Sequence, residues 1–453
     1  MEIVTLVQQV HSQILYYHVQ YIPNQQQQRC KRGLSYQNRP SSSKNFIPKT
    51  ESEVEEGFHR HPKWEKPTNC VEFPSILPPE LISEIISKLP VKSLLKFRSV
   101  SKSWLSLISS PEFINTHLTV YNNKDQRHHR LMLGFGMHCY RLRECSFSSL
   151  FYNPVIEISE LNYPMEVEYD EGFSPVGSIN GLICLAHGYH SPKHLFLWNP
   201  SIRKYKKLPN SRPKFRYDAC MYGFGYDEFH DDYKVVGIFC IYGSSLHIDF
   251  KIYSLKNDSW RKIRYSHDGM CFSRRSVFVK GKLHWTTHSR DQYVWGGGIV
   301  SFSLANENWG KVEEPCYGGK ESISELGVFG NDLCGFSHDL AIGVDVWVMK
   351  DYGITESWTK ICTITYPKLE RYLYFPSVFL SDNGDVLVGY GSTFIIYNPK
   401  DDSLKYPKVI NYNEWQIGEI YIESLISPLS TEGLRPKQKQ CVKKLKSRQS
   451  SNK

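Results

Sequence analysis

The chain has 453 residues, enough for one small domain and a larger one of about 300 residues that can bury a substantial core. Its formal net charge of +9 is concentrated at the two ends, because residues 1–70 contribute +3 and residues 431–453 contribute +7. A basic nucleic-acid-binding face would lie in the folded body, which is almost neutral, so we expect no nucleic-acid partner. The 12 cysteines form no CxxC pair, which argues against a zinc site and a secreted disulfide framework, and a cytoplasmic or nuclear location fits.

Residues 1–70 are predicted to form a flexible leader. Polar residues interrupt the apolar positions of residues 1–22 and no basic start precedes them, so we expect neither a signal peptide nor a membrane span. From Gln25 to about Asn69 the composition is polar and contains proline, which is typical of flexible segments.

Residues 76–108 carry more apolar surface than so short a segment can bury by itself, since 16 of these 33 residues are aliphatic or aromatic. Pro78 and Pro79 suit the first turn of a helix, and Pro90 ends it. At helical spacing, five apolar side chains fall within an arc of roughly 140° around the helix axis and form one apolar stripe. It consists of Leu81, Ile82, Ile85, Ile86 and Leu89.

Two further short helices are predicted after Pro90. The first gathers Val91, Leu94 and Leu95, and the second carries Trp104, Leu107 and Ile108. Three helices in about 33 residues are too small a unit to be stable unaided. They either pack on the rest of the chain or are completed by a second protein.

Three motifs in this segment decide between these alternatives. They are Leu77-Pro78-Pro79-Glu80, Leu89-Pro90-Val91-Lys92-Ser93-Leu94-Leu95 and Arg98-Ser99-Val100-Ser101-Lys102-Ser103-Trp104. Together they resemble the F-box in residue type and spacing, from residue 73 to about 117. The resemblance implies that the segment inserts into a Skp-type adaptor, which links it to a cullin-RING ubiquitin ligase. The adaptor-binding residues expected from it are Leu77, Pro78, Leu81, Ile82, Ile85, Leu89, Pro90, Val91, Leu94, Leu95, Arg98, Val100 and Trp104.

Beyond residue 120 the pattern changes to short β-branched and aromatic runs separated by turn residues. Predicted hairpin turns recur about every 50 residues, at Asn180-Gly181, Asp231-Asp232, Lys280-Gly281, Gly330-Asn331 and Asn383-Gly384. A second signature recurs in phase: a large residue at the end of a strand is followed seven residues later by another. Its copies run from Trp198 to Tyr205, Tyr253 to Trp260, Phe302 to Trp309 and Tyr397 to Leu404, with a longer copy from Val348 to Trp358 and a weak first copy from Tyr140 to Phe147.

Six copies of such a repeat predict a six-bladed β-propeller-like domain, because one four-stranded sheet cannot bury both faces until neighbours stack around an axis. A β-sandwich with evenly spaced turns is the alternative. If the ring closes, the segment Ile420–Ile426 would pair near Leu131–Leu133.

This repeat region also resembles the F-box-associated, kelch-like domain of plant F-box proteins. The resemblance rests on Gly177–Leu182, Leu197–Arg203, Gly223–Asp227, Tyr233–Val236, Ser259–Arg261, Gly281–Trp285 and Glu356–Trp358. It implies that the β-domain recruits the protein to be ubiquitinated, although it assigns no target-binding residue. The domains expected are a leader (1–70), an F-box (71–118), an all-β domain (119–428) and a basic tail (429–453) that could be an import signal.

No residue pattern points to catalysis, a cofactor or a metal. His187, His190 and His194 have ligand-like spacing but lie in a loop between strands, and the run Gly223-Phe224-Gly225 lacks a third glycine and a following helix. Trp260, Trp309 and Trp358 recur in phase, which favours packing between blades over a ligand cage. The two resemblances imply that the chain is a non-catalytic substrate receptor of a Skp/cullin/F-box ligase, with a carbohydrate-binding or other ligand-binding propeller module as the alternative.

Overall fold

The computed structural model describes the helical segment and most of the β-domain. The described residues are 79–122, 128–135, 142–163, 172–188, 192, 194–211, 219–242, 246–264, 271–288, 295–315, 322–339, 343–365, 377–381, 383–390, 393–410 and 416–429. The predicted leader, the basic tail from residue 430, Leu77 and Pro78 lie outside them. The described residues fall into two compact units, one of residues 79–86 with 96–105 and one of residues 87–95 with those from 106 onward.

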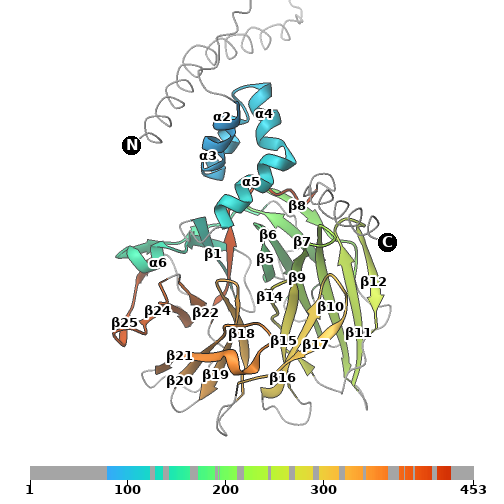
Figure 1. Ribbon diagram of the computed structural model, residues 1–453, viewed down its shortest axis with the longest axis vertical. Helices are drawn as coiled ribbons and strands as arrows, with labels where there is room; N and C mark the ends of the chain where they lie inside the picture. The colour runs from blue at the N-terminus through green and yellow to red at the C-terminus, as the bar shows by residue number, and fades with distance from the viewer. Residues whose placement is uncertain are drawn as a thin grey trace, which may run out of the picture. The chain divides into compact units, whose positions relative to one another are not determined.

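Four helices occupy the helical segment (Figure 1). They are α2 (Pro79–Ser87), α3 (Val91–Phe97), α4 (Lys102–Ser109) and α5 (Pro111–Asn122). Serines that precede two of them cap their free amides: Ser101 Oγ accepts from the Trp104 amide at 3.1 Å, and Ser110 Oγ accepts from the Phe113 amide at 3.2 Å. The first three helices agree with the prediction from sequence, whereas α5 was not predicted. Its start carries the usual signals, a capping serine at Ser110 and a proline in the first turn at Pro111.

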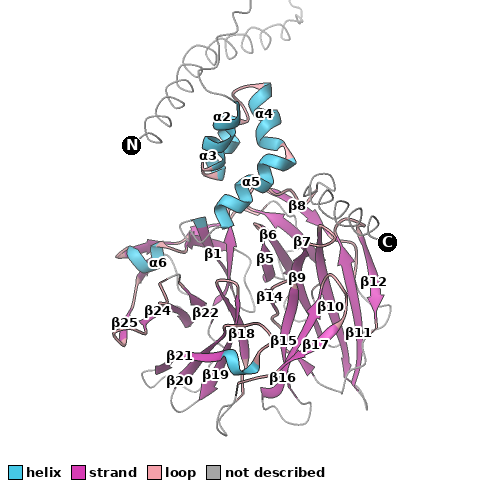
Figure 2. Cartoon of the chain, in the orientation of Figure 1, coloured by secondary structure: helices cyan, strands magenta, loops and turns pink. Residues whose placement is uncertain are grey.

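The β-domain consists of six antiparallel sheets, each with four or five strands, and one short parallel pair (Figure 2). The first sheet contains β27 (Gln416–Ile422), β1 (His129–Phe135), β2 (Arg143–Ser146) and β4 (Ser159–Glu160), and the second contains β5 (Phe173–Ile179), β6 (Leu182–His187), β7 (His194–Asn199) and β8 (Lys204–Lys207). The third contains β9 (Ala219–Asp227), β10 (Asp232–Tyr242), β11 (Leu246–Ser254) and β12 (Ser259–Ile263), and the fourth contains β13 (Cys271–Phe272), β14 (Val277–Val279), β15 (Lys282–His288), β16 (Trp295–Ser303) and β17 (Trp309–Val312). The fifth contains β18 (Glu325–Phe329), β19 (Asp332–Asp339), β20 (Gly343–Met349) and β21 (Trp358–Thr365), and the sixth contains β22 (Ser377–Leu380), β23 (Val386–Tyr390), β24 (Thr393–Asn398) and β25 (Ser403–Lys405). The parallel pair is β3 (Val155–Glu157) with β26 (Lys408–Ile410), and α6 (Ser149–Tyr152) precedes β3.

These six sheets are the blades of a β-propeller. One edge strand of each blade contacts the corresponding strand of the next, in the order β27, β5, β9, β14, β18, β22 and back to β27. Such a closed cycle of contacts requires a ring, so the predicted six-bladed propeller is confirmed and the β-sandwich alternative is excluded.

Closure of the ring depends on the pairing of strands from the two ends of the domain. β27 lies antiparallel to β1, with Ile420 opposite Leu131 and Gly418 opposite Leu133. The predicted closing pair is thus confirmed for residues 420–422, but the strand begins earlier, at Gln416, and ends before residues 423–426. The chain beyond β27 is then held by the second blade, because the buried Asn199 donates from Nδ2 to the carbonyl oxygens of Ser424 (3.0 Å) and Ile426 (2.8 Å).

Each predicted turn connects the edge strand that contacts the neighbouring blade to the next strand of its own blade. Asn180 and Gly181 have φ of 54° and 79°, and Lys280 and Gly281 have φ of 48° and 76°, as a tight hairpin with two left-handed residues requires. At Gly181 a side chain would also collide with the side chain of Ser424 and with the backbone carbonyl oxygen of Ile422. Glycine is therefore needed here both for the turn and for the passage of the closing segment.

The seven-residue signature marks the hairpin between the third and fourth strands. Its two large residues face each other across the ladder, as Tyr253 and Trp260 or Phe302 and Trp309 do. In the fifth blade Trp358 faces Met349 rather than the predicted Val348, because the longer connection containing the 3₁₀ turn Thr355–Ser357 shifts the register by one residue. Tyr140, the start of the weak first copy, lies outside the described residues.

Asn199 provides a test of ring closure. Asn199→Asp keeps the size of the side chain but replaces two donors by a carboxylate against two buried carbonyls, so we expect a loss of roughly 2–3 kcal/mol of unfolding free energy. Chemical denaturation of the full chain measures this loss, and faster proteolysis near residues 424–429 should accompany it. The exposed Asn257→Asp is the matched control; equal stability of the two variants would argue against a closing role for Asn199.

Candidate functional site

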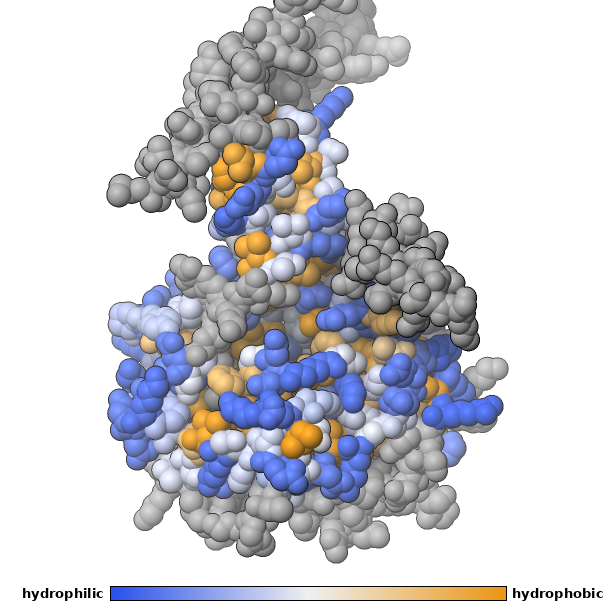
Figure 3. Space-filling model, in the orientation of Figure 1, coloured by the Kyte–Doolittle hydropathy of each residue, from blue (hydrophilic) through white to orange (hydrophobic). Residues whose placement is uncertain are grey.

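Apolar side chains reach the surface of the helical segment (Figure 3). Leu81 of α2 and Leu105 of α4 are 43% and 47% exposed and belong to the same compact unit. The other predicted adaptor-binding residues that retain some exposure are Ile82, Ile85, Leu89, Pro90, Leu95, Arg98, Val100 and Trp104. Leu105 was missed because residues 104, 105, 107 and 108 are all apolar, so helical spacing alone does not show which one remains outside.

Two of the predicted adaptor-binding residues are internal. Val91 and Leu94 of α3 are 1% and 0% exposed, so in this structure neither side chain has surface to offer a partner. They lie one turn apart on the buried face of a seven-residue helix. Their contribution to docking would come from holding the segment folded, whereas Leu81 and Leu105 can make contact directly.

Trp104 is held in a defined orientation. Its amide is capped by Ser101, and its indole packs edge to face against Phe97 with ring centroids 5.5 Å apart. Both rings belong to the unit that contains Leu81 and Leu105. The segment thus presents a preorganised apolar surface, which reduces the entropy lost on binding.

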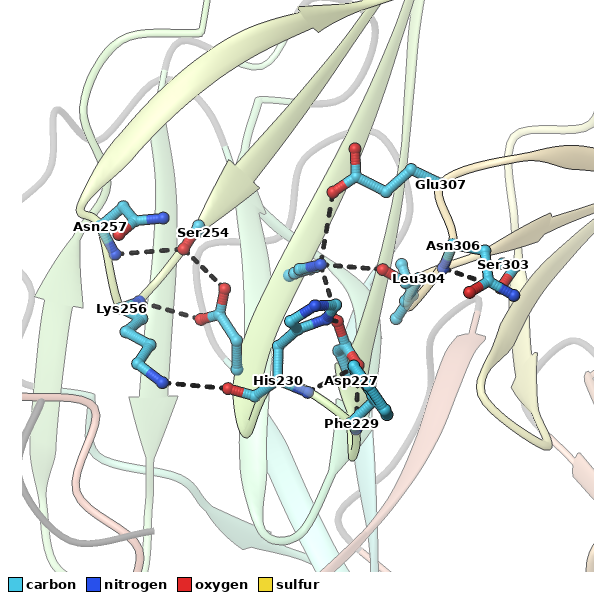
Figure 4. Close-up of polar contacts among 12 residues, drawn as sticks. Asp227, Phe229, His230, Ser254, Lys256, Asn257, Ser303, Leu304, Asn306 and Glu307 are labelled. Carbon is cyan, nitrogen blue, oxygen red and sulfur yellow. Dashed lines mark hydrogen bonds and ion pairs between the residues drawn. The ribbon is translucent and has the colours of Figure 1, made fainter. Parts of the chain in front are cut away.

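In the propeller, a cluster of charged side chains joins the third and fourth blades (Figure 4). Lys234 Nζ lies 2.7 Å from Asp227 Oδ2, 2.8 Å from the Leu304 carbonyl oxygen and 3.4 Å from Glu307 Oε1. The other oxygen of Asp227 accepts from the amides of Phe229 (3.0 Å) and His230 (3.1 Å). Lys234 and Asp227 are almost completely buried, with 7% and 0% of their side chains exposed.

The contacts of this cluster are those of a structural clamp. Burial alone would raise the pKa of Asp227, but hydrogen bonds from Lys234 and His230 outweigh it and hold the pKa below the usual 3.8. Asp227 stays ionised, and its oxygens are occupied by Lys234, His230 and the turn amides. A general base or nucleophile needs an accessible lone pair, so this cluster fixes a turn and a blade interface rather than performing catalysis.

The in-phase tryptophans also connect blades, which confirms the packing interpretation. Trp260 Nε1 donates to the Pro209 carbonyl (2.8 Å) and Trp358 Nε1 donates to the Glu313 carbonyl (2.9 Å), in each case on the preceding blade. Trp309 packs on Phe250 of the third blade, with ring centroids 5.1 Å apart.

The histidine triplet is only partly visible. His187 is buried and stacks on His194 with centroids 6.2 Å apart, whereas His190 lies outside the described residues. Within the described ranges, no group of three or more His, Cys, Asp or Glu side chains could hold a metal ion. Nor is any helix there long and apolar enough to cross a membrane.

Breaking the clamp should be more costly than removing it. Lys234→Met leaves the buried Asp227 carboxylate without its cation and should lower the unfolding free energy by about 3–5 kcal/mol, whereas adding Asp227→Asn should recover part of that loss. Urea unfolding of the two single variants and the double variant gives the coupling, with the exposed Lys204→Met as control. Simply additive losses would mean that the two side chains do not act as a pair.

His284 provides a second clamp with a pH signature. Its Nε2 lies 2.7 Å from the Tyr352 hydroxyl of the fifth blade, and burial lowers its pKa from 6.5 to about 4. Because the unfolded chain then binds a proton more readily, this histidine should cost up to about 3 kcal/mol of stability as pH falls from 6.5 to 4. His284→Asn should flatten the fall in unfolding free energy over that range; an unchanged slope would contradict the assignment.

Comparison with known proteins places both parts of the chain. The family model of the F-box domain matches residues 74–116, and that of the F-box associated β-propeller domain matches residues 133–427. The F-box/kelch-repeat protein At3g23880 of Arabidopsis thaliana is 31% identical over 78% of this chain and 96% of its own length. The F-box protein CPR1 of the same plant is 31% identical over 71% of this chain and 81% of its own length. The chain therefore belongs to the family of plant F-box proteins that carry a C-terminal F-box-associated β-propeller domain.

Proposed function

We propose that this protein is the substrate receptor of a Skp/cullin/F-box ubiquitin ligase, docking on a Skp-type adaptor through its helical segment and binding a target protein through its propeller. The observation that carries the proposal is the exposure of Leu81 and Leu105, at 43% and 47%, within the residues that the F-box model matches. Burying a fully exposed leucine contributes roughly 1.5–3 kcal/mol, so covering the exposed part of each of these two side chains contributes about 1 kcal/mol toward a protein–protein affinity.

In this role the chain acts by proximity. The adaptor tethers the helical segment to the ligase, the propeller holds the target, and other subunits transfer the ubiquitin. Because both proteins are then bound to one assembly, the target lysines meet the conjugating enzyme at a high effective concentration. The chain itself would supply no catalytic group and would act in the cytoplasm or the nucleus.

A propeller suits the receptor part because its scaffold and its surface are separable. The in-phase aromatic residues and the two clamps hold blades together from inside, as Trp260, Lys234 and His284 do. Surface residues can therefore vary without loss of the ring, which is what recognition of a particular target requires.

Substitutions on the exposed helical surface provide the test. Leu81→Asp and Leu105→Asp place a charge where the adaptor would bury a leucine, so each should weaken binding to a purified Skp-type adaptor at least about tenfold in a calorimetric titration. Thermal unfolding should change little, because each leucine is nearly half exposed and an aspartate there can keep its carboxylate in water. Ile354→Asp, at a 53% exposed position of the fifth blade, is the matched control.

The buried Leu94 is unsuitable for this experiment, since an aspartate there would unfold the segment and abolish binding for the wrong reason. Full adaptor binding by both exposed-surface variants would refute the proposed docking surface.

A further inference from the structure

The short parallel pair of β3 and β26 offers a second exposed surface, outside the six blades. Val155 lies opposite Lys408, Ile156 opposite Val409, and Glu157 opposite Ile410. Burial alternates along both strands, because Ile156 and Val409 pack into the core beneath while the flanking residues are exposed. The outer face of the pair therefore carries Val155, Glu157, Lys408 and Ile410.

Exposed apolar side chains concentrate around this face. Five of the 11 large apolar residues that are exposed among the described ones lie on α6, β3, β25, β26 or the link between β25 and β26. They are Tyr152, Val155, Leu404, Tyr406 and Ile410, which are 69%, 45%, 37%, 59% and 37% exposed. Isolated exposed apolar residues are ordinary on a protein surface, but a group of five on short elements that adjoin in the chain or pair with each other marks an interaction site.

The charges on the face indicate what would cover it. Val155 and Ile410 occupy one diagonal of a four-residue rectangle, and Glu157 and Lys408 occupy the other. Within the described part of the chain neither Glu157 nor Lys408 takes part in an ion pair. One acidic and one basic side chain at opposite corners make the face complementary to itself.

We propose that this face, defined by Val155, Glu157, Lys408 and Ile410 with Tyr152, Leu404 and Tyr406 around it, binds the same face of a second copy of the chain. A two-fold axis along the Val155–Ile410 diagonal places Val155 over Val155 of the second copy and Ile410 over Ile410 of the second copy. It also brings Lys408 of each copy over Glu157 of the other. The two strand pairs then cross steeply, as sheets do in orthogonal packing.

The geometry tolerates this arrangement. Paired strands lie about 4.8 Å apart and alternate residues along a strand about 6.6 Å apart, so the rectangle is close enough to square for long Lys and Glu side chains to reach. Two-fold axes along or across the strands place apolar residues over charged ones, and the axis along the Glu157–Lys408 diagonal places each charged residue over its own copy. The Val155–Ile410 axis alone pairs like with like on the apolar corners and opposite charges on the others, which is the self-complementarity that an isologous dimer requires.

The small area sets the expected strength. A stable dimer buries roughly 800 Å² on each partner, more than four side chains provide, so Tyr152, Leu404 and Tyr406 must be covered as well and the dimer should be reversible. A dimer would carry two propellers and two helical segments, which would raise the avidity for a multivalent target. The self-association itself does not depend on the ligase role.

Reciprocal charge substitution tests the arrangement. In sedimentation velocity of the full chain over a range of concentrations, we expect a concentration-dependent dimer. Glu157→Lys alone or Lys408→Glu alone places like charges together twice per dimer and should weaken association about tenfold, whereas the double variant restores both pairs and should recover it. Ile410→Asp should shift the chain to monomer.

The controls separate this interface from other causes of failure. Lys204→Glu and Phe229→Lys change an exposed lysine and an exposed apolar residue elsewhere and should leave the dimer intact. Thermal unfolding checks that every variant is folded, and adaptor binding by the monomeric variants should persist. A wild-type chain that stays monomeric at all concentrations, or a dimer that ignores these substitutions, would overturn the proposal.

Discussion

The pairing of β27 with β1 is the constraint on which the rest of the β-domain depends. A four-stranded sheet with two apolar faces is stable only between two neighbours, so an open row of six blades would leave its first and last faces in water. Here the last strand of the domain completes the first blade, and Asn199 of the second blade holds the chain that follows. This closure joins segments more than 220 residues apart in sequence, so the stability of every blade is coupled to that of the whole ring.

Local clamps then adapt each interface between blades to its own residues. Between the third and fourth blades the task is performed by Lys234, which is ion-paired to Asp227 within the third blade and donates to the Leu304 carbonyl of the fourth. Between the fourth and fifth blades it is performed by a neutral histidine against a tyrosine, and elsewhere by indole donors. A buried ion pair gains little net stability over an apolar contact of equal size, but it is costly to misalign. Its value here is geometric, since Lys234 reaches a carbonyl of the next blade only when the two sheets are in register.

Much of the fold could be predicted because its repeating constraints have sequence signatures. Left-handed backbone at Asn180-Gly181 and Lys280-Gly281 demands particular residues, and the large residues that face each other in each outer hairpin keep a fixed spacing. The shift at Met349 could not be predicted, because an insertion shows how many residues are added but not which strand absorbs them. The pair of β3 and β26 was also missed, since three-residue strands some 250 residues apart have no detectable period.

The helical segment shows a different limit of sequence reasoning. Its apolar residues outnumber those that three short helices can bury, which is the signal that a partner exists, but periodicity does not sort them into inner and outer ones. Val91 and Leu94 are inside, whereas Leu81 and Leu105 are outside. A sequence motif contains both the buried and the exposed residues, because the buried ones keep the helices folded and the exposed ones can then contact a partner. The same distinction applies to the propeller, where residues that recur once per blade hold neighbouring blades together. Residues specific to this protein's recognition must therefore be sought at positions outside the repeat. The exposed residues around β3 and β26 occupy such positions.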